Sequence, residues 1–247
     1  MHTDPAYFFE SILYRQFQFP FLDLHGQRIA ELGQQLGLSL DFDIQILDYK
    51  LKKSLLNSED EQKLRLQFKI DGDTLAIDKI ESTRTDPYRF QKYPSIALVT
   101  YPHYAKPIDA LGRWKRYDKQ LYQDSIEYAM QAQATQSLIL NKNKEVVETS
   151  LSNFYFIQNG ILYTPPLKSG AVNGVFRRFL ASHMTLVEKN LLVSELGQIE
   201  QCFISSAIRG IVPVHSIDNR PYPFDMVGEF QEKLNLIFAY TFIPKRT

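Results

Sequence analysis

EVVETSLSNFYFIQNGILYTPPLKSGAVNGVFRRF, residues 145–179, is the most informative stretch of this chain. Its runs EVVET, NFYFIQ and ILYT are short, rich in β-branched and aromatic residues and bounded by polar residues, which predicts three strands. The Asn-Gly pair between the last two runs is a strong hairpin signal. Three short strands in succession predict a compact antiparallel sheet, and a helix is expected from Gly174 over GVFRRFLASHMTLVEKN.

Similar patterns lie on both sides of this stretch. Upstream, we expect a helix at QLYQDSIEYAMQAQA and a strand around SLILN. Downstream, the strand-like runs are LLVSEL, CFISSA and IVPVHSI, and a closing helix is expected from Met226 to about Tyr240.

The first part of the chain predicts a separate unit. YFFESILYRQFQFPFLDLH is dense in aromatic and β-branched residues and predicts two strands, followed by an amphipathic helix around HGQRIAELGQQLGL with Ile29, Leu32 and Leu36 as its buried stripe. LRLQFKID and DTLAIDKIE flank an Asp-Gly-Asp turn and predict a hairpin, and SIALVTY adds a strand. The proline-containing stretch YPHYAKPIDALG is the candidate linker.

Helices and strands are interspersed without the regular alternation of a doubly wound sheet. We therefore expect an α+β fold with two lobes, a small N-terminal lobe over residues 1–106 and a larger C-terminal lobe over residues 107–247.

Composition narrows the function. The chain has 247 residues, 44% of them apolar, with 28 basic and 28 acidic side chains, so its net charge favours neither nucleic acid nor an anionic membrane as a partner. One cysteine, no signal-peptide pattern and no long apolar run predict a cytoplasmic protein. Zinc-type cysteine pairs, a Walker loop and a G-x-S-x-G elbow do not occur in the sequence, so no metal is expected and small-molecule chemistry is favoured.

Two residues could carry such chemistry. Lys115 lies in GRWKRYD, where the like charges of Arg113 and Arg116 would favour the neutral, nucleophilic amine, although most lysines in basic clusters are solvated surface groups. Glu148 lies in an apolar strand and either points to solvent or is buried against a cation.

Other residues suggest an anion site. Gly174 opens a predicted helix whose first N–H groups could bind a phosphate, although a tight helix entry is the commoner reason for one glycine. Ser205 and Ser206 follow a strand and could hold a phosphate or cap a short helix. Arg28, taken alone, is expected at the surface.

These residues occur in a characteristic order. The order is H-x-x-R at His25 and Arg28, then Lys115, E-x4-N at Glu148 and Asn153, YTPP at residues 163–166 and NGVFRR at residues 173–178. The succession resembles the class IV pyridoxal-phosphate enzymes, which include branched-chain and D-amino-acid aminotransferases and aminodeoxychorismate lyase. The resemblance covers nearly the whole chain, from FFESI near residue 8 to IVPVHSID near residue 218.

The resemblance implies a fold type IV enzyme with pyridoxal 5'-phosphate between its lobes. Lys115 would hold the cofactor as a Schiff base and shuttle the α-proton of the substrate, and Glu148 would pair with the pyridine nitrogen. Asn153 would support the strand turn. The residues implied to hold the phosphate are Arg28, the backbone at Val175 and Phe176, and Ser206 with Ala207.

Some features depart from the family pattern. The chain starts almost at FFESI, where these enzymes usually have an additional strand before it, so one edge of the small lobe is expected to differ; Asp118 replaces a common asparagine, and Phe176 replaces a common threonine. Residues 64–94 match little of the family, so the residue that binds a substrate carboxylate is open, with Arg89, Arg113 and Arg209 as candidates.

Three functions stay open at this point. The leading prediction is an aminodeoxychorismate lyase-like enzyme of folate synthesis that eliminates pyruvate to leave 4-aminobenzoate, because SGAVNGVFRRF resembles that lyase. The alternative is a branched-chain or D-amino-acid aminotransferase, which FFESI favours. The third is a non-catalytic relative. The resemblance also implies an amino-acid-like substrate and a homodimer.

Overall fold

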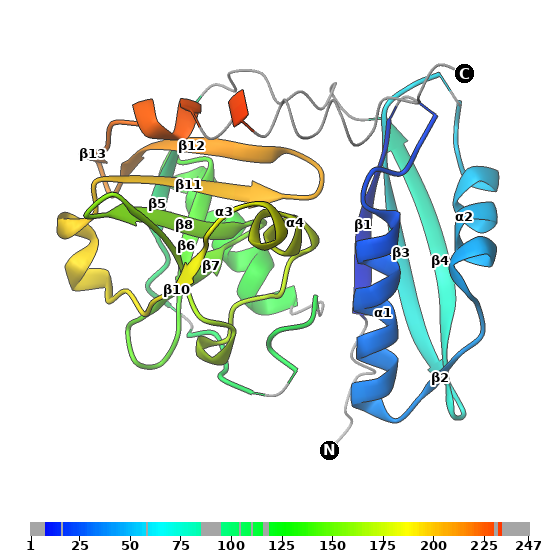
Figure 1. Ribbon diagram of the computed structural model, residues 1–247. Helices are drawn as coiled ribbons and strands as arrows, with labels where there is room; N and C mark the ends of the chain where they lie inside the picture. The colour runs from blue at the N-terminus through cyan, green and yellow to red at the C-terminus, as the bar shows by residue number, and fades with distance from the viewer. Residues whose placement is uncertain are drawn as a thin grey trace.

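The computed structural model describes residues 8–15, 17–57, 59–84, 95–103, 105–109, 111–115, 119–229 and 232–233. In this part of the chain, strands form a four-stranded sheet and a nine-stranded sheet, and each sheet belongs to one lobe (Figure 1). No helix in these ranges is long and apolar enough to cross a membrane.

The first lobe has the strand order β1-β3-β4-β2 and two helices. Its elements are β1 (Phe8–Tyr14), α1 (Leu22–Leu36), β2 (Ser39–Leu40), α2 (Ile44–Lys53), β3 (Gln62–Asp71) and β4 (Thr74–Arg84). Alternate residues of β3 are buried, and Leu64 and Leu66 pack with Ile29 and Leu32 of α1 in one core. This alternation is the expected period of a half-buried strand.

The second lobe has the strand order β10-β9-β8-β11-β12-β5-β6-β7, with β13 paired to β12. Its strands are β5 (Ile96–Thr100), β6 (Gln136–Leu140), β7 (Val146–Thr149), β8 (Asn153–Gln158), β9 (Ile161–Thr164), β10 (Val187–Glu188), β11 (Gln201–Ser206), β12 (Gly210–Ile217) and β13 (Arg220–Pro221). Its helices are η1 (Lys119–Gln123), α3 (Asp124–Gln131), η2 (Leu167–Ser169), α4 (Val175–His183) and η3 (Val193–Gln198).

The hairpin predictions are confirmed. β3 pairs antiparallel with β4, and β8 pairs antiparallel with β9. Asn159 and Gly160 have φ of 52° and 70°, the left-handed conformation that a tight Asn-Gly turn requires. The boundary between residues 106 and 107 stays a prediction, while β5, which precedes it, pairs with β12 and β6 of the second sheet.

Four local predictions were wrong. Of the three strands expected to form one compact antiparallel sheet, β7 pairs with β6 and not with β8. The first segment contains one strand and not two, because the chain turns after β1 at Phe17 (φ 64°) and α1 begins at Leu22. LLVSEL contains the 3-10 helix η3, which the Glu195 carboxylate caps by accepting from the Leu192 N–H at 2.9 Å. The helix from Gly174 ends at His183, and Val187–Glu188 form β10 beside β9.

Two further points concern helices. The sequence analysis missed α2, although Asp43 caps it by accepting from the N–H groups of Gln45 and Ile46. Residues 225–229 are helical, but most of the predicted closing helix from Met226 to Tyr240 lies outside the described residues.

Contacts between the lobes are specific. Arg178 of α4 forms two hydrogen bonds of 2.7 Å with the Glu31 carboxylate of α1. Leu13 and Phe21 of the first lobe pack into a hydrophobic core with Val175 and Phe179 of the second. α1 and α4 therefore lie against each other where the lobes meet.

Candidate active site

Lys115 lies in the loop that follows Trp114 and is bound to strand β1. Its carbonyl accepts from the Phe9 N–H at 3.1 Å, and its Nζ donates to Ser11 Oγ at 3.1 Å. The ammonium also lies 4.7 Å from the centroid of the Phe9 ring. Burial, and then the Arg28 guanidinium, lower the pKa of Lys115 to about 8.

Of the two arginines expected to act on Lys115, only Arg113 lies in the described part of the chain. Arg113 donates to Gln35 Oε1 at 2.9 Å and lies over the Trp114 ring, and it is not a cause of the lowered pKa. Arg116 lies outside the described residues. Among the described residues, the folded chain brings Arg28 of α1 close to the amine.

Arg28 is buried, which corrects its expected surface position. Its guanidinium donates through Nε to Glu10 Oε1 at 2.7 Å, through Nη2 to Glu10 Oε2, and through Nη1 to the Asn173 carbonyl at 3.3 Å. His25 Nδ1 lies 2.6 Å from Glu10 Oε2. Burial alone would raise the pKa of Glu10, but Arg28 and His25 outweigh burial and bring it to about 2.

Burial also sets the protonation state of His25. It lowers the pKa of the imidazole against the opposing effect of Glu10, so the ring is neutral at pH 7. A neutral ring donates through Nδ1 to the Glu10 carboxylate. The H-x-x-R motif therefore places two side chains of α1 on one carboxylate of β1.

Glu148 of β7 is buried, with 2% of its surface exposed. Its Oε1 accepts from Lys106 Nζ at 2.5 Å and from the Tyr122 hydroxyl at 2.6 Å, and its Oε2 accepts from the Val172 N–H at 2.9 Å. Of the two positions considered for Glu148, the structure shows the one against a cation, because a buried carboxylate needs such partners.

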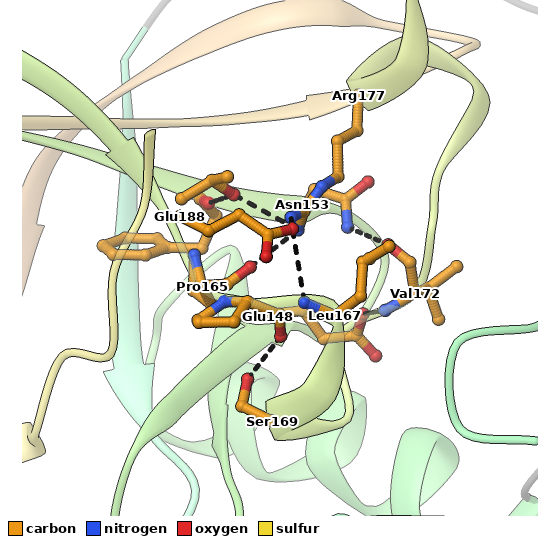
Figure 2. Close-up of polar contacts among 11 residues, drawn as sticks. Glu148, Asn153, Pro165, Leu167, Ser169, Val172, Arg177 and Glu188 are labelled. Carbon is orange, nitrogen blue, oxygen red and sulfur yellow. Dashed lines mark hydrogen bonds and ion pairs between the residues drawn. The ribbon is translucent and has the colours of Figure 1, made fainter. Parts of the chain in front are cut away.

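Val172 and Asn173 connect Glu148 with the lysine and arginine sites. The Val172 carbonyl accepts from Asn153 Nδ2 at 2.7 Å, so Asn153 holds the residue whose N–H binds Glu148 (Figure 2). The Asn173 carbonyl accepts from Arg28, and the Asn173 N–H donates to the Arg113 carbonyl at 2.8 Å. One loop thus contacts β7, α1 and the segment that ends at Lys115.

Arg177 connects helix α4 to the segment after β9 and to β10. It is buried, donates to the Pro165 carbonyl at 2.7 Å and pairs with Glu188 of β10 at 2.6 Å (Figure 2). The YTPP and NGVFRR motifs are therefore in direct contact. We infer that this contact fixes where the N-terminus of α4 points.

Gly174 is the N-cap residue of α4. A Cβ at this position would lie 2.1 Å from Asn153 Oδ1, so any larger residue must displace that amide or the backbone. The N–H groups of the first helical turn have no partner within the helix and can bind an anion. Arg28 reaches the same helix entrance through Asn173.

The two serines at the end of β11, Ser205 and Ser206, differ in burial and in hydrogen bonding. Ser205 is buried and donates to the Tyr155 hydroxyl at 2.9 Å, whereas Ser206 is partly buried and accepts from the Arg209 N–H at 3.1 Å. Ala207 packs against the core that contains Val175 and Phe176. The Ser206 turn and the start of α4 therefore border the same core.

The side chains that contact the predicted residues were not themselves predicted from the sequence. Glu10 and Ser11 lie within FFESI, whose acidic residue in an apolar strand was a usable signal. Lys106 and Tyr122 gave no signal, because they reach Glu148 only in the folded chain. Trp114 lines both the pocket with Lys115 and Arg28 and the pocket with Lys106 and Tyr122.

The described part of the structure does not place the three arginines considered for a substrate carboxylate together at the site. Arg209 is exposed, Arg113 contacts Gln35, and Arg89 lies outside the described residues.

Two sheet-based lobes with these elements define a fold type IV pyridoxal-phosphate enzyme. A structure of a putative 4-amino-4-deoxychorismate lyase from Legionella pneumophila is similar, with a TM-score of 0.78 and 22% identity, covering 94% of this chain and 91% of that one. By sequence, D-alanine aminotransferase of Staphylococcus aureus is 25% identical over 236 residues, covering 85% of this chain and 79% of that protein. Residues 7–217 match the amino-transferase class IV family, and the chain belongs to that family.

Pyridoxal phosphate is the cofactor of these enzymes. A structure of an aminotransferase from Brucella abortus bound to it has a TM-score of 0.75 and 16% identity, covering 96% of this chain and 90% of that one. The residues described above fit this group, since they offer an amine of lowered pKa, a buried carboxylate, and an arginine beside a helix entrance where glycine packs closely against Asn153.

Proposed function

We propose that this enzyme is an aminotransferase that acts on a small amino acid, with D-alanine as the first substrate to test. The observation that carries the proposal is the Lys115 amine, whose pKa is lowered to about 8 and which shares a pocket with Arg28. The choice of aminotransferase is supported by the sequence similarity to D-alanine aminotransferase. It was the alternative in the sequence analysis, and it now takes precedence over the lyase.

Each residue has a stated task. Lys115 binds the cofactor covalently and moves the proton at the substrate's α-carbon, because its neutral amine is both nucleophile and base. Glu148 binds the ring nitrogen, and Val172 and Asn153 keep its carboxylate in place. The bound cofactor supplies the electron sink for the α-carbon.

The entrance of α4 would hold the cofactor's phosphate. Arg28 and the backbone at Val175 and Phe176 contribute charge and N–H donors, and Ser206 with Ala207 closes the site from the turn after β11. Glu10 and His25 are positioning residues, since they orient the guanidinium of Arg28.

The second candidate is the aminodeoxychorismate lyase-like activity. SGAVNGVFRRF favours it, and the Legionella structure supports its consideration, although that likeness concerns the fold. The two functions differ in one step, because an aminotransferase converts the cofactor to its amine form in a half-reaction and a lyase does not.

The test begins with the spectrum of the purified protein with pyridoxal phosphate and D-alanine, without an acceptor. Conversion to the amine form, reversed by 2-oxoglutarate, supports the aminotransferase. No conversion, with 4-aminobenzoate formed from aminodeoxychorismate, supports the lyase. Borohydride reduction should label the wild type and Lys168→Ala, an exposed control, but not Lys115→Ala. An unlabelled wild type would support the non-catalytic relative.

A further inference from the structure

Lys106 is held at Glu148 by both its backbone and its side chain. Its N–H donates to the Leu140 carbonyl at 2.8 Å, and it forms an isolated parallel bridge with Asn141 at the end of β6. Only 6% of its side chain is exposed, and its Nζ lies 2.5 Å from Glu148 Oε1. A lysine is rarely buried without a role for its charge.

The carboxylate of Glu148 has room for one more donor. Two donors share Oε1, which are Lys106 and Tyr122, and one donor, the Val172 N–H, uses Oε2. An ionised carboxylate accepts about four hydrogen bonds. Hydrogen-bonding capacity is therefore left on Oε2, where a ring N–H would donate while Lys106 stays at Oε1.

We propose that Lys106 is a positioning residue that shares Glu148 with the cofactor's ring nitrogen and thereby limits how fully that nitrogen is protonated. The inference rests on the proposed role of Glu148.

The physical reason is the charge balance of a buried cluster. Lys106 and Glu148 form a neutral pair before any ligand binds, so a protonated ring nitrogen adds a second cation to one carboxylate. A like charge at such short range disfavours the charged form by about one pKa unit or more. The ring nitrogen would therefore lose its proton at a lower pH than it would beside Glu148 alone, which weakens the electron sink.

The test measures the ring nitrogen itself. Pyridoxal phosphate labelled with ¹⁵N in the ring is bound to the wild type and to variants, and the ¹⁵N chemical shift at fixed pH reports how far the nitrogen is protonated. We expect Lys106→Met and Lys106→Gln to move the shift toward the protonated form. Lys106→Arg, which keeps the charge, should retain the wild-type value, and Lys142→Met, which removes an exposed lysine of the β6–β7 turn, should as well.

Glu148→Gln tests the proposed role of Glu148 separately from that of Lys106. If it moves the shift toward the unprotonated form and Lys106→Met adds nothing to it, Lys106 acts through Glu148. If Glu148→Gln moves the shift but Lys106→Met and Lys106→Gln do not, the inference on Lys106 is overturned and the role of Glu148 stands. If Glu148→Gln changes nothing, both fail.

Stability provides a second readout. Lys106→Met leaves Glu148 without its cation, so the cofactor should raise the Tm of this variant more than that of the wild type. An equal rise would contradict the sharing of Glu148. Should Lys106→Met fold poorly alone, the ¹⁵N measurement is made on protein refolded with the cofactor and on Lys106→Gln, which keeps a donor.

Discussion

Lys115 shows how one residue acquires its reactivity from its surroundings. Most lysines are protonated at pH 7, but burial and the Arg28 guanidinium lower the pKa of this one to about 8. About one tenth of the amine is then neutral at pH 7 and about nine tenths at pH 9. The neutral form is the nucleophile.

The rate at which Lys115 attaches pyridoxal phosphate should therefore follow this titration. We expect the rate to rise about tenfold from pH 7 to pH 9, with a midpoint near 8. Stopped-flow absorbance of the cofactor-free protein measures it, with Lys168→Ala as the control. A rate that still rises steeply above pH 10 would show an unperturbed lysine.

At the scale of elements, one buried carboxylate ties β1 to α1. Glu10 accepts from both Arg28 and His25, and burial opposes its charge while these two partners favour it. Its pKa of about 2 lies below the ordinary value of 4.5. The folded state therefore gains stability from Glu10 above about pH 4.5 and loses that stability as the pH falls toward 2.

Glu10→Gln should lower the free energy of unfolding by about 3–5 kcal/mol at pH 7, because it leaves Arg28 buried without its anion. The difference from the wild type should shrink as the pH falls below 4.5. Urea unfolding at several pH values measures it, with Glu81→Gln on the exposed face of β4 as the control. A difference independent of pH would mean that packing, and not charge, is lost.

The N-terminus of helix α4 packs closely against Asn153 at Gly174. A Cβ on Gly174 would meet Asn153 Oδ1 at 2.1 Å, and Asn153 also holds the Val172 carbonyl. Gly174→Ala must therefore move the Asn153 side chain, the helix entrance or the loop that binds Glu148.

We expect Gly174→Ala to weaken cofactor binding at least tenfold, equal to about 1.4 kcal/mol. Titration followed by absorbance measures the affinity, and thermal unfolding checks the fold. The double variant with Asn153→Ala should recover part of the affinity, because the clash is gone. If the two substitutions weaken binding additively, the clash is not the cause.

On the scale of the whole molecule, the site is assembled from both lobes. Lys115 contacts β1, Arg28 contacts the Asn173 carbonyl, and Arg178 pairs with Glu31. A ligand that binds such a junction stabilises both lobes at once.

Saturating pyridoxal phosphate should accordingly raise the free energy of unfolding by about 2.7 kcal/mol at a hundredfold excess over its Kd. Urea unfolding followed by tryptophan fluorescence measures this, since Trp114 lines the pockets on both sides of the site. A cofactor that stabilises only one of two separate transitions would show that the lobes are not coupled.

The protein is also expected to be a homodimer, a prediction drawn from the family. The aromatic first segment offers little surface for such a contact, since Phe8, Ile12 and Tyr14 are buried, although Phe17 is exposed. Sedimentation equilibrium at several concentrations, with and without cofactor, tests the prediction. A monomer that retains full activity would contradict it.

Much of the molecule follows from local sequence. The Asn159-Gly160 turn, the alternation in β3 and the stripe of Ile29 and Leu32 are local patterns, and the structure has the elements that they predict. The ordered motifs also identified the family, because Lys115, Glu148 and the glycine before α4 occur in the order that its members share.

Only tertiary structure decided how those residues are partnered. LLVSEL became a 3-10 helix through a capping carboxylate, and Arg28 became buried because Glu10 of another element neutralises it. Lys106 meets Glu148 across distant segments, and no local periodicity encodes that contact. Sequence pattern reports propensity and the order of residues, whereas burial and the distances between charges, which set pKa and ionic pairing, exist only in the folded chain.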